Sequence, residues 1–168
     1  IEAIKNNITI YSAHTNLDNA AEGVNKQIAN LLGLVNTKPL QDKGNGNGAG
    51  IIGDLPNSIS EQQLLKQLQE LFKVPAIKHN RELGRSISKV GLCGGSGAFL
   101  IPDAVAMGAD IFITGEIGYH RMFDYDGRIK LAELGHYESE QFTIELLYNK
   151  LNTLCKGLKL VKTNVKTN

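Results

Sequence analysis

The sequence predicts an α/β fold in which a mostly parallel sheet carries helices on both faces. From residue 86 onward, short apolar runs alternate with helical patterns, as is typical of parallel strands joined by helices. Glycine-rich turns separate these runs, most clearly at residues 93–97. The chain has 168 residues, of which 42% are hydrophobic, so it can bury a core as one domain or as two small ones.

The N-terminal part predicts a strand followed by a helix. Residues 7–13 are β-branched and mostly apolar, which favours a buried strand. Asn19, with Glu22 three residues later, has the form of a helix N-terminus. We therefore expect a helix from Asn19 to about Leu32, ended by Gly33.

Residues 44–50 are nearly all glycine and asparagine, a composition that cannot pack a core and that tolerates positive φ. We expect a flexible linker here, between a first lobe of residues 1–43 and a main α/β lobe of residues 51–168. A phosphate-binding P-loop is the alternative, but no Lys-Ser or Lys-Thr pair follows the glycines.

The main lobe is predicted to begin with a strand at residues 51–55. Ser58 and Glu61 have the spacing of a capping box, and the helix after them carries a leucine stripe and stops near Pro75. Further strands are expected at residues 76–80, 87–92, 110–114, 129–134 and 158–162, and helices at 98–107, at 119–123 and from His136 to about Leu154.

Composition narrows the possible partners. Eighteen basic and seventeen acidic residues give a net charge of +1, so no nucleic-acid or membrane-surface partner is expected. No apolar run approaches the roughly 18 residues that span a bilayer, and no signal peptide opens the chain. Cys93 and Cys155 suggest neither a metal site nor a disulfide framework. We expect a cytoplasmic protein.

Both ends of the sequence look cut. The first residue is Ile1 rather than Met, and residues 161–168 alternate like a strand and then stop. We therefore expect this chain to be a fragment of a longer protein.

Two stretches place an imidazole four residues before a carboxylate, namely His14 with Asp18 and His136 with Glu140. Positions i and i+4 share one helix face at roughly 5–6 Å, so both side chains can reach one divalent cation. Both stretches follow a predicted strand, where α/β sheets bind ligands. The alternative is that Asp18 only caps a helix, and that His136 and Glu140 merely suit a helix start. The helix dipole should keep His136 neutral, the form that binds metal.

Residues 93–97, called the glycine turn below, lie between a predicted strand and a predicted helix. Backbone N–H groups at such a place can bind a phosphate, which makes Gly94, Gly95, Ser96 and Gly97 a candidate anion site. The alternative is a tight turn that needs glycine for positive φ. Cys93 has no basic neighbour and is interpreted as a small buried residue.

Glu116 and His120 follow the next predicted strand. They are candidates for general acid/base groups or for residues that orient metal ligands. The alternative is that both are solvated loop residues.

Four motifs occur in a fixed order, at residues 11–18, 91–97, 110–116 and 135–140. Together they resemble the GTP cyclohydrolase I type 2 homologue family, also called Nif-three-like, over nearly the whole chain. The resemblance implies an α/β/α fold, ring-shaped homo-oligomers, and two divalent cations (Zn²⁺, Mn²⁺, Fe²⁺ or Mg²⁺) in a complete site. It also implies metal roles for Asp18, His136 and Glu140, with Glu140 as the bridge, and a place near the metals for His14.

Two features depart from the family pattern. The chain has no adjacent His-His pair, which supplies two of the family's ligands, and the glycine–asparagine stretch stands where many members carry an inserted domain. We therefore expect a partial site with weak or absent activity.

Two functions follow. The first is a hydrolase for a nucleotide-like small molecule, in which cations roughly 3.5–4 Å apart activate water for attack on an electrophilic carbon. The second is a non-enzymatic, metal-binding regulatory or scaffold protein that works as an oligomer.

Overall fold

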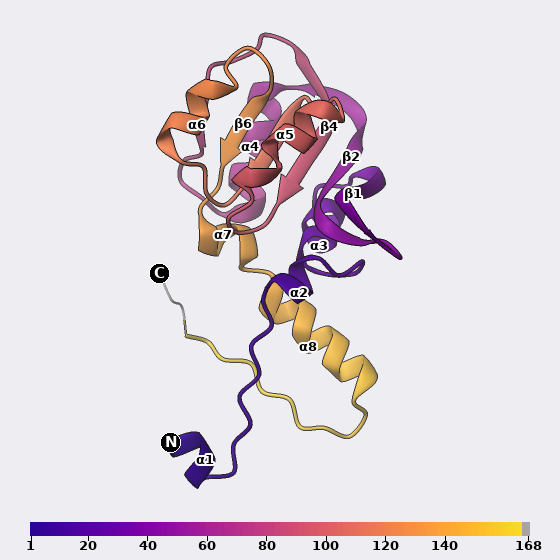
Figure 1. Cartoon of the computed structure of the whole chain (residues 1–168), viewed down its shortest axis with the longest axis vertical. Helices are drawn as coiled ribbons and strands as arrows, with labels where there is room; N and C mark the ends of the chain where they lie inside the picture. The colour runs from indigo at the N-terminus through magenta and orange to yellow at the C-terminus, as the bar shows by residue number, and fades with distance from the viewer. Residues whose placement is uncertain (166–168) are drawn as a thin grey trace.

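The computed structural model describes residues 1–165 and contains a six-stranded mixed sheet in the order β1-β2-β4-β5-β6-β3 (Figure 1). Strands β4, β5 and β6 are parallel, whereas β1, β2 and β3 pair antiparallel with their neighbours. The predicted α/β class is confirmed, with parallel pairing in the centre of the sheet. The strands are β1 (Val35–Gly44), β2 (Asn47–Ser60), β3 (Lys78–His79), β4 (Ser86–Cys93), β5 (Ile111–Thr114) and β6 (Lys130–Glu133).

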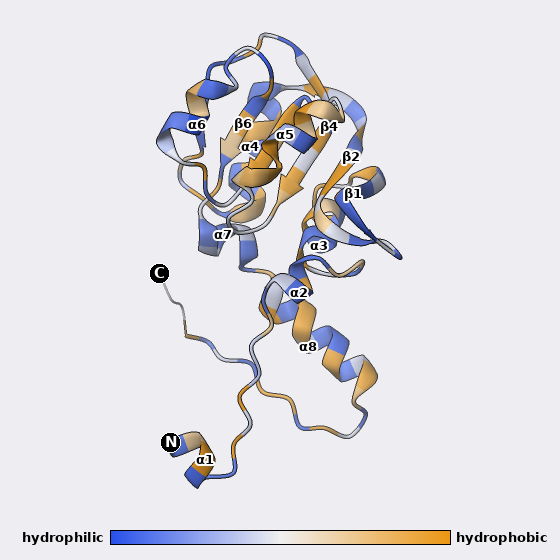
Figure 2. Ribbon diagram, viewed as in Figure 1, coloured by the Kyte–Doolittle hydropathy of each residue, from blue (hydrophilic) through white to orange (hydrophobic). Residues whose placement is uncertain are grey.

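Helices cover both faces of the sheet, as predicted. Helices α3 and α4 pack on one face, and η1, α5 and α6 pack on the other. Figure 2 shows the hydrophobic residues gathered in the sheet and on α5. The helices are α1 (Glu2–Lys5), α2 (Thr15–Asp18), α3 (Val24–Leu31), α4 (Glu61–Phe72), η1 (Ala98–Leu100), α5 (Ile101–Ala106), α6 (Tyr119–Asp124), α7 (His136–Glu140) and α8 (Thr143–Leu154).

Strand β5 shows why the central strands are apolar throughout. Ile111 and Ile113 belong to the core under α3 and α4, while Phe112 belongs to the core under α5 and α6. All of them are at most 2% exposed. Successive side chains of a strand point to opposite faces, so a strand covered on both faces must be apolar at every position.

The start of α4 differs from the prediction by two residues. The capping box is formed by Ser60 and Gln63 rather than by Ser58 and Glu61, because β2 continues to Ser60. Glu61 has a different role: its Oε1 accepts hydrogen bonds from the backbone N–H groups of Leu83 and Gly84.

The N-terminal prediction is wrong in two respects. Residues 7–13 form no strand, and Ile10 and Tyr11 are more than 75% exposed, because within residues 1–165 no strand lies beside this β-branched run to pair with it. The helix expected from Asn19 to about Leu32 begins only at Val24, as α3, and residues 19–23 are not helical. The backbone of these residues bonds to the hairpin instead, as when Gly48 N–H donates to the Asn19 carbonyl.

The glycine–asparagine stretch is a β-hairpin rather than a flexible linker. Gly44 ends β1 and pairs with Asn47, which begins β2. Asn45 and Gly46 form the turn with φ of 54° and 76°. Positive φ at both central positions matches the twist of the flanking strands, which is why Asn-Gly is favoured there. The replacement of an inserted domain at this place stays a prediction.

The C-terminal part also differs from the prediction. The helix that begins at His136 is interrupted after Glu140 and resumes as α8, which has no buried residue. Residues 158–162 are irregular and form no strand. The alternating pattern of residues 161–168 is not a strand up to residue 165, and its last residues lie outside the described part. In residues 1–165, no helix is long and apolar enough to cross a bilayer.

Candidate metal centre

Three turns lie side by side at the carboxyl ends of β4, β5 and β6. Gly115 N–H donates to the Gly95 carbonyl at 2.8 Å, and Gly135 N–H donates to the Gly115 carbonyl at 3.0 Å. A Cβ at Gly115 would lie 2.6 Å from the Gly95 oxygen, so this approach requires glycine. The side chains that follow these glycines therefore share one rim, as expected for parallel strand ends.

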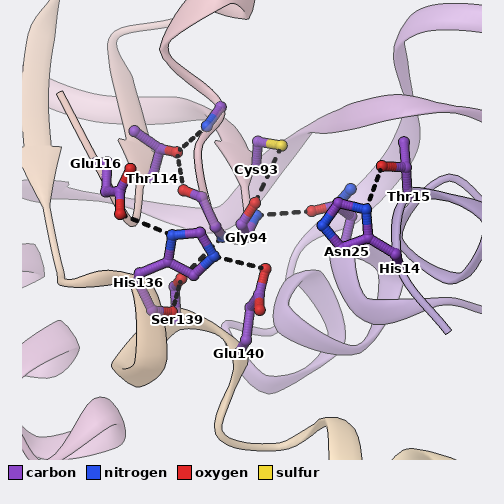
Figure 3. Close-up of polar contacts among 12 residues, drawn as sticks. His14, Thr15, Asn25, Cys93, Gly94, Thr114, Glu116, His136, Ser139 and Glu140 are labelled. Atoms are coloured by element: carbon purple, nitrogen blue, oxygen red, sulfur yellow. Dashed lines mark hydrogen bonds and ion pairs between the residues drawn. The ribbon is translucent and has the colours of Figure 1, made fainter. Parts of the chain in front are cut away.

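His136 begins α7, and both of its ring nitrogens face carboxylates (Figure 3). Nδ1 donates to Oε1 of Glu116 at 2.7 Å, and Nε2 lies 3.7 Å from Oε1 of Glu140. The hydrogen bond with Glu116 is the main reason that the pKa of His136 lies above its ordinary value of 6.5. The expected lowering by a helix dipole is wrong, because α7 has only five residues and a carboxylate contacts the ring.

Asp18 and Glu140 are half-buried carboxylates. Burial raises the pKa of both above the ordinary range, and the charges of His14 and His136 act in the opposite direction on both. In the part of the chain that the structure describes, no N–H or O–H group hydrogen-bonds to either carboxylate, apart from the longer contact of Glu140 with His136. A half-buried carboxylate without such donors is well suited to a cation.

His14 is the residue directly before α2, the helix that ends at Asp18, and its side chain makes no capping hydrogen bond. Its Nδ1 lies 3.1 Å from the hydroxyl of Thr15, and the side chain is exposed. Its charge lowers the pKa of both Asp18 and Glu140. The charges of His14 and His136, which come from opposite ends of the sequence, therefore both act on the Asp18 and Glu140 carboxylates.

Gly95 keeps space open beside the cluster of candidate ligands, which consists of His14, Asp18, His136 and Glu140. It has φ of +64°, and a Cβ built on it would overlap Oε1 of Glu140 and lie 3.3 Å from Nε2 of His136. Any other residue would therefore place its side chain against the two donor atoms that face each other.

The donor set fits a divalent cation. Two carboxylates and two imidazoles are ligands for Zn²⁺, Mn²⁺ or Fe²⁺, and Zn²⁺ commonly takes four such donors. Among residues 1–165, no three His, Cys, Asp or Glu side chains stand close enough together to hold an ion as they are placed. To bind one ion together, the side chains of His14 and Asp18 would have to move closer to those of His136 and Glu140.

Three backbone N–H groups of the glycine turn already donate hydrogen bonds to side chains of the protein. Gly94 N–H donates to Oδ1 of Asn25, and Gly95 N–H donates to Oγ of Ser139. Gly97 N–H donates to Oγ1 of Thr114. These bonds compete with an anion for the same donors, so the geometry favours the tight-turn alternative over the phosphate site.

Cys93, which precedes these glycines, is buried as expected. Burial, together with the charges of Asp18 and Glu140, raises the pKa of its thiol to about 12.

Glu116 and His120 have different surroundings. Glu116 contacts His136 and so lies beside the cluster of candidate ligands. His120 lies on α6, is exposed, and packs its ring at 5.4 Å against Tyr119. None of the pKa shifts of Asp18, His136 and Glu140 has His120 among its causes.

Sequence reasoning did not single out Asn25, Thr114 or Ser139, which hold the glycine turn. Asn25 is 2% exposed and stands among the apolar residues of α3. A polar residue on the buried face of an amphipathic helix needs a hydrogen-bond partner, and this signal was available in the sequence.

The whole chain matches a protein family. The model of the family described as Duf34/NIF3 (NGG1p interacting factor 3) matches residues 1–168. A Streptococcus pneumoniae protein named GTP cyclohydrolase 1 type 2 homolog is 39% identical over 144 residues, covering 82% of this chain and 53% of that protein. A protein of the same name from Lactococcus lactis is 32% identical over 166 residues, covering 96% of this chain and 62% of that protein. The chain thus spans little more than half the length of such relatives.

Solved structures share the fold. The structure of a Bacillus cereus protein related to NIF3 has a TM-score of 0.82 at 20% identity, covering 99% of this chain and 74% of that one. A Thermus thermophilus protein has a TM-score of 0.67 at 27% identity, covering 87% of this chain and 57% of that one.

Proposed function

Because the chain belongs to the Duf34/NIF3 family, we propose that it binds divalent cations between Asp18, His136 and Glu140, with His14 beside them. The observation that carries the proposal is the placement of His136. Its Nδ1 is held by Glu116 at 2.7 Å, which leaves Nε2 facing Glu140. A histidine oriented through its other nitrogen by a carboxylate is the usual arrangement at protein metal sites.

The ion count follows from the donors. Four donors suit one four-coordinate cation, so the second cation implied by the family resemblance would need further ligands from outside this set. Zn²⁺, Mn²⁺ and Fe²⁺ suit the mixture of imidazole and carboxylate, and Mg²⁺ suits the carboxylates alone.

We further propose that the complete site hydrolyses a nucleotide-like small molecule. The support is the name of the relatives, which are GTP cyclohydrolase 1 type 2 homologs. A bound cation would supply a Lewis acid to the site. Glu116 would hold the His136 proton at Nδ1 and keep the ring in its metal-binding orientation. The catalytic role of His120 stays a prediction, and the contacts of His120 in the structure do not support it.

A cavity beside Asp18 offers room for part of such a substrate. It has a volume of about 220 Å³, and its lining includes Asp18, Asn25, Lys26 and Lys38. The lysines could face an anionic group, a role that the glycine turn is poorly placed to fill. A cavity of about 440 Å³ between α3 and α8 contains none of the candidate ligands, so we do not assign it to this reaction.

A scaffold without enzymatic activity is the second candidate. The observation that favours it is the apolar face of α8, where Ile144, Leu151 and Leu154 are 41–77% exposed. Large exposed apolar residues on one helix often mark an interface between subunits. In this case the cation site would serve a regulatory or structural role in a homo-oligomer.

The test is titration of the purified chain with Mn²⁺ and Zn²⁺ by calorimetry. We expect saturable binding that is at least tenfold weaker in Asp18→Ala and in His136→Ala. His120→Ala is the matched control and should bind like the wild type. Equal binding by all variants would refute the site. Metal-dependent turnover of GTP would then favour the hydrolase, and saturable binding without product would favour the scaffold.

A further inference from the structure

The glycine turn joins the two halves of the candidate site through buried side chains. One half is the stretch with His14 and Asp18, and the other is α7 with His136 and Glu140. As Figure 3 shows, Asn25 and Ser139 reach the turn from opposite sides. Neither side chain is among the proposed metal ligands, although Asn25 also lines the cavity beside Asp18.

Asn25 connects the turn to the Asp18 stretch. Its Oδ1 accepts a hydrogen bond from Gly94 N–H at 2.8 Å, and its Nδ2 donates to the backbone carbonyl of Asp18 at 3.0 Å. The residue is 2% exposed, so water cannot readily replace either partner. A Cβ at Gly94 would lie 3.3 Å from side chains of Val24 and Ile28, which shows how closely α3 approaches the turn.

Ser139 makes the equivalent connection on the other side. Its Oγ accepts a hydrogen bond from Gly95 N–H at 2.9 Å and donates to the backbone carbonyl of His136 at 2.8 Å. It is 1% exposed. The serine therefore ties the first residue of α7 to the turn from within the same helix.

From these contacts we infer that Asn25 and Ser139 are positioning residues that set the separation between Asp18 and the His136–Glu140 pair. Gly94 and Gly95 are consecutive residues, and their Cα atoms are about 3.8 Å apart. Each half of the site is therefore hydrogen-bonded to one of two neighbouring backbone N–H groups. The planar peptide unit between Gly94 and Gly95 then sets the distance between the two halves, and with it the space that a cation must fit. This inference rests on the proposed cation site.

The experiment measures Mn²⁺ affinity and thermal stability together in the purified chain. We expect Asn25→Ala and Ser139→Ala each to weaken Mn²⁺ binding by about 10-fold or more, the range seen when residues that orient metal ligands are removed. Amide hydrogen exchange without metal should speed up at Gly94 in the first variant and at Gly95 in the second.

Each variant has a matched control. Asn80 is also a buried asparagine, 7% exposed, whose amide bridges the backbone of Ile129 and Leu131 far from the site. Ser60 is a serine whose hydroxyl caps α4. Asn80→Ala and Ser60→Ala should lower Tm as the test variants do, but they should leave Mn²⁺ affinity unchanged. A residue with a merely structural role would lower Tm without weakening Mn²⁺ binding, as these controls do, whereas a positioning residue lowers both.

Two results would overturn the inference, and they are distinguishable. If the wild type shows no saturable Mn²⁺ binding, the proposed function fails and this inference fails with it. If the wild type binds and the folded Asn25→Ala binds equally well, only the inference fails. Should Asn25→Ala not fold, Ser139→Ala decides, because loss of one hydroxyl is a smaller change.

Discussion

At the scale of single residues, the candidate site contains ionisable side chains in half-buried positions, where burial disfavours their charged forms. Asp18 and Glu140 have a raised pKa because they are half-buried, and His136 has a raised pKa because it contacts Glu116. Shifted titrating groups gathered in one place are a common mark of a functional site. The histidine and the thiol of Cys93 give predictions that can be measured without any ligand.

The titration of His136 should depend on Glu116. Glu116→Gln removes the carboxylate that stabilises the charged ring, so the pKa of His136 should fall toward 6.5. In the wild type, the stabilisation from this pair is fully present below 6.5 and is lost as the pH rises through the higher pKa of the folded state. NMR titration of the imidazole in metal-free protein measures the midpoint. Glu82→Gln is a remote control, and a wild-type midpoint at or below 6.5 would contradict the prediction.

Cys93 should resist alkylation in the native protein. Its thiol has a pKa of about 12 and is buried, whereas Cys155 is exposed. Because only the thiolate reacts, iodoacetamide at pH 8 should modify Cys93 at least about 100-fold more slowly than Cys155. Mass spectrometry of peptides from native and unfolded protein gives both rates. Similar rates at both cysteines in the native state would show that Cys93 is not buried as described.

At the scale of elements, tertiary partners decide where helices and strands begin and end. Residues 19–23 have a helix-start pattern, yet they bond to the β1–β2 hairpin, so α3 begins only at Val24. Residues 7–13 have a strand composition, yet they lie exposed without a partner strand. The hairpin shows the reverse, because a sequence that reads as a linker becomes ordered when its flanks pair.

The hairpin turn should be sensitive to side chains at Gly46. Gly46→Val forces a β-branched residue into a φ of 76° and should lower the free energy of unfolding by about 1–2 kcal/mol. Urea denaturation measures the change. Asn45→Gly is the control, because glycine adopts the same positive φ, and it should change stability by less than about 0.5 kcal/mol. Equal stability of both variants would mean that the turn is not formed as described.

At the scale of the whole molecule, a buried ion pair joins segments that are distant in sequence. Lys130 on β6 is fully buried, and its Nζ lies 3.4 Å from Oε2 of Glu61 at the start of α4. The same Nζ donates to the Asn80 carbonyl at 2.9 Å. This connection lies at the amino end of β6, whereas the candidate metal site lies beyond its carboxyl end.

Removing the lysine should destabilise the fold strongly. Lys130→Met leaves the Glu61 carboxylate buried without its counter-charge, so the free energy of unfolding should fall by about 3–5 kcal/mol. Adding Glu61→Gln to this variant should recover part of the loss. Lys5→Met breaks an exposed pair with Glu2 and should cost less than about 1 kcal/mol. Urea unfolding of all four proteins makes the comparison, and a loss for Lys130→Met as small as that for Lys5→Met would contradict it.

The sequence by itself determined the α/β class, the central strands, and the residues offered for the candidate site. These follow from local signals: unbroken apolar runs at residues 111–113, glycines at strand ends, and imidazole–carboxylate pairs four residues apart. Only the tertiary structure decided that β1, β2 and β3 pair antiparallel, that residues 44–47 form the turn of the β1–β2 hairpin, and that Glu116 contacts His136 while His120 lies apart. It also decided that Asn25 and Ser139 accept hydrogen bonds from the N–H groups of the consecutive residues Gly94 and Gly95. The physical reason is that local patterns reflect each residue's own preference, whereas pairing and contact between distant segments depend on which partners the fold brings together.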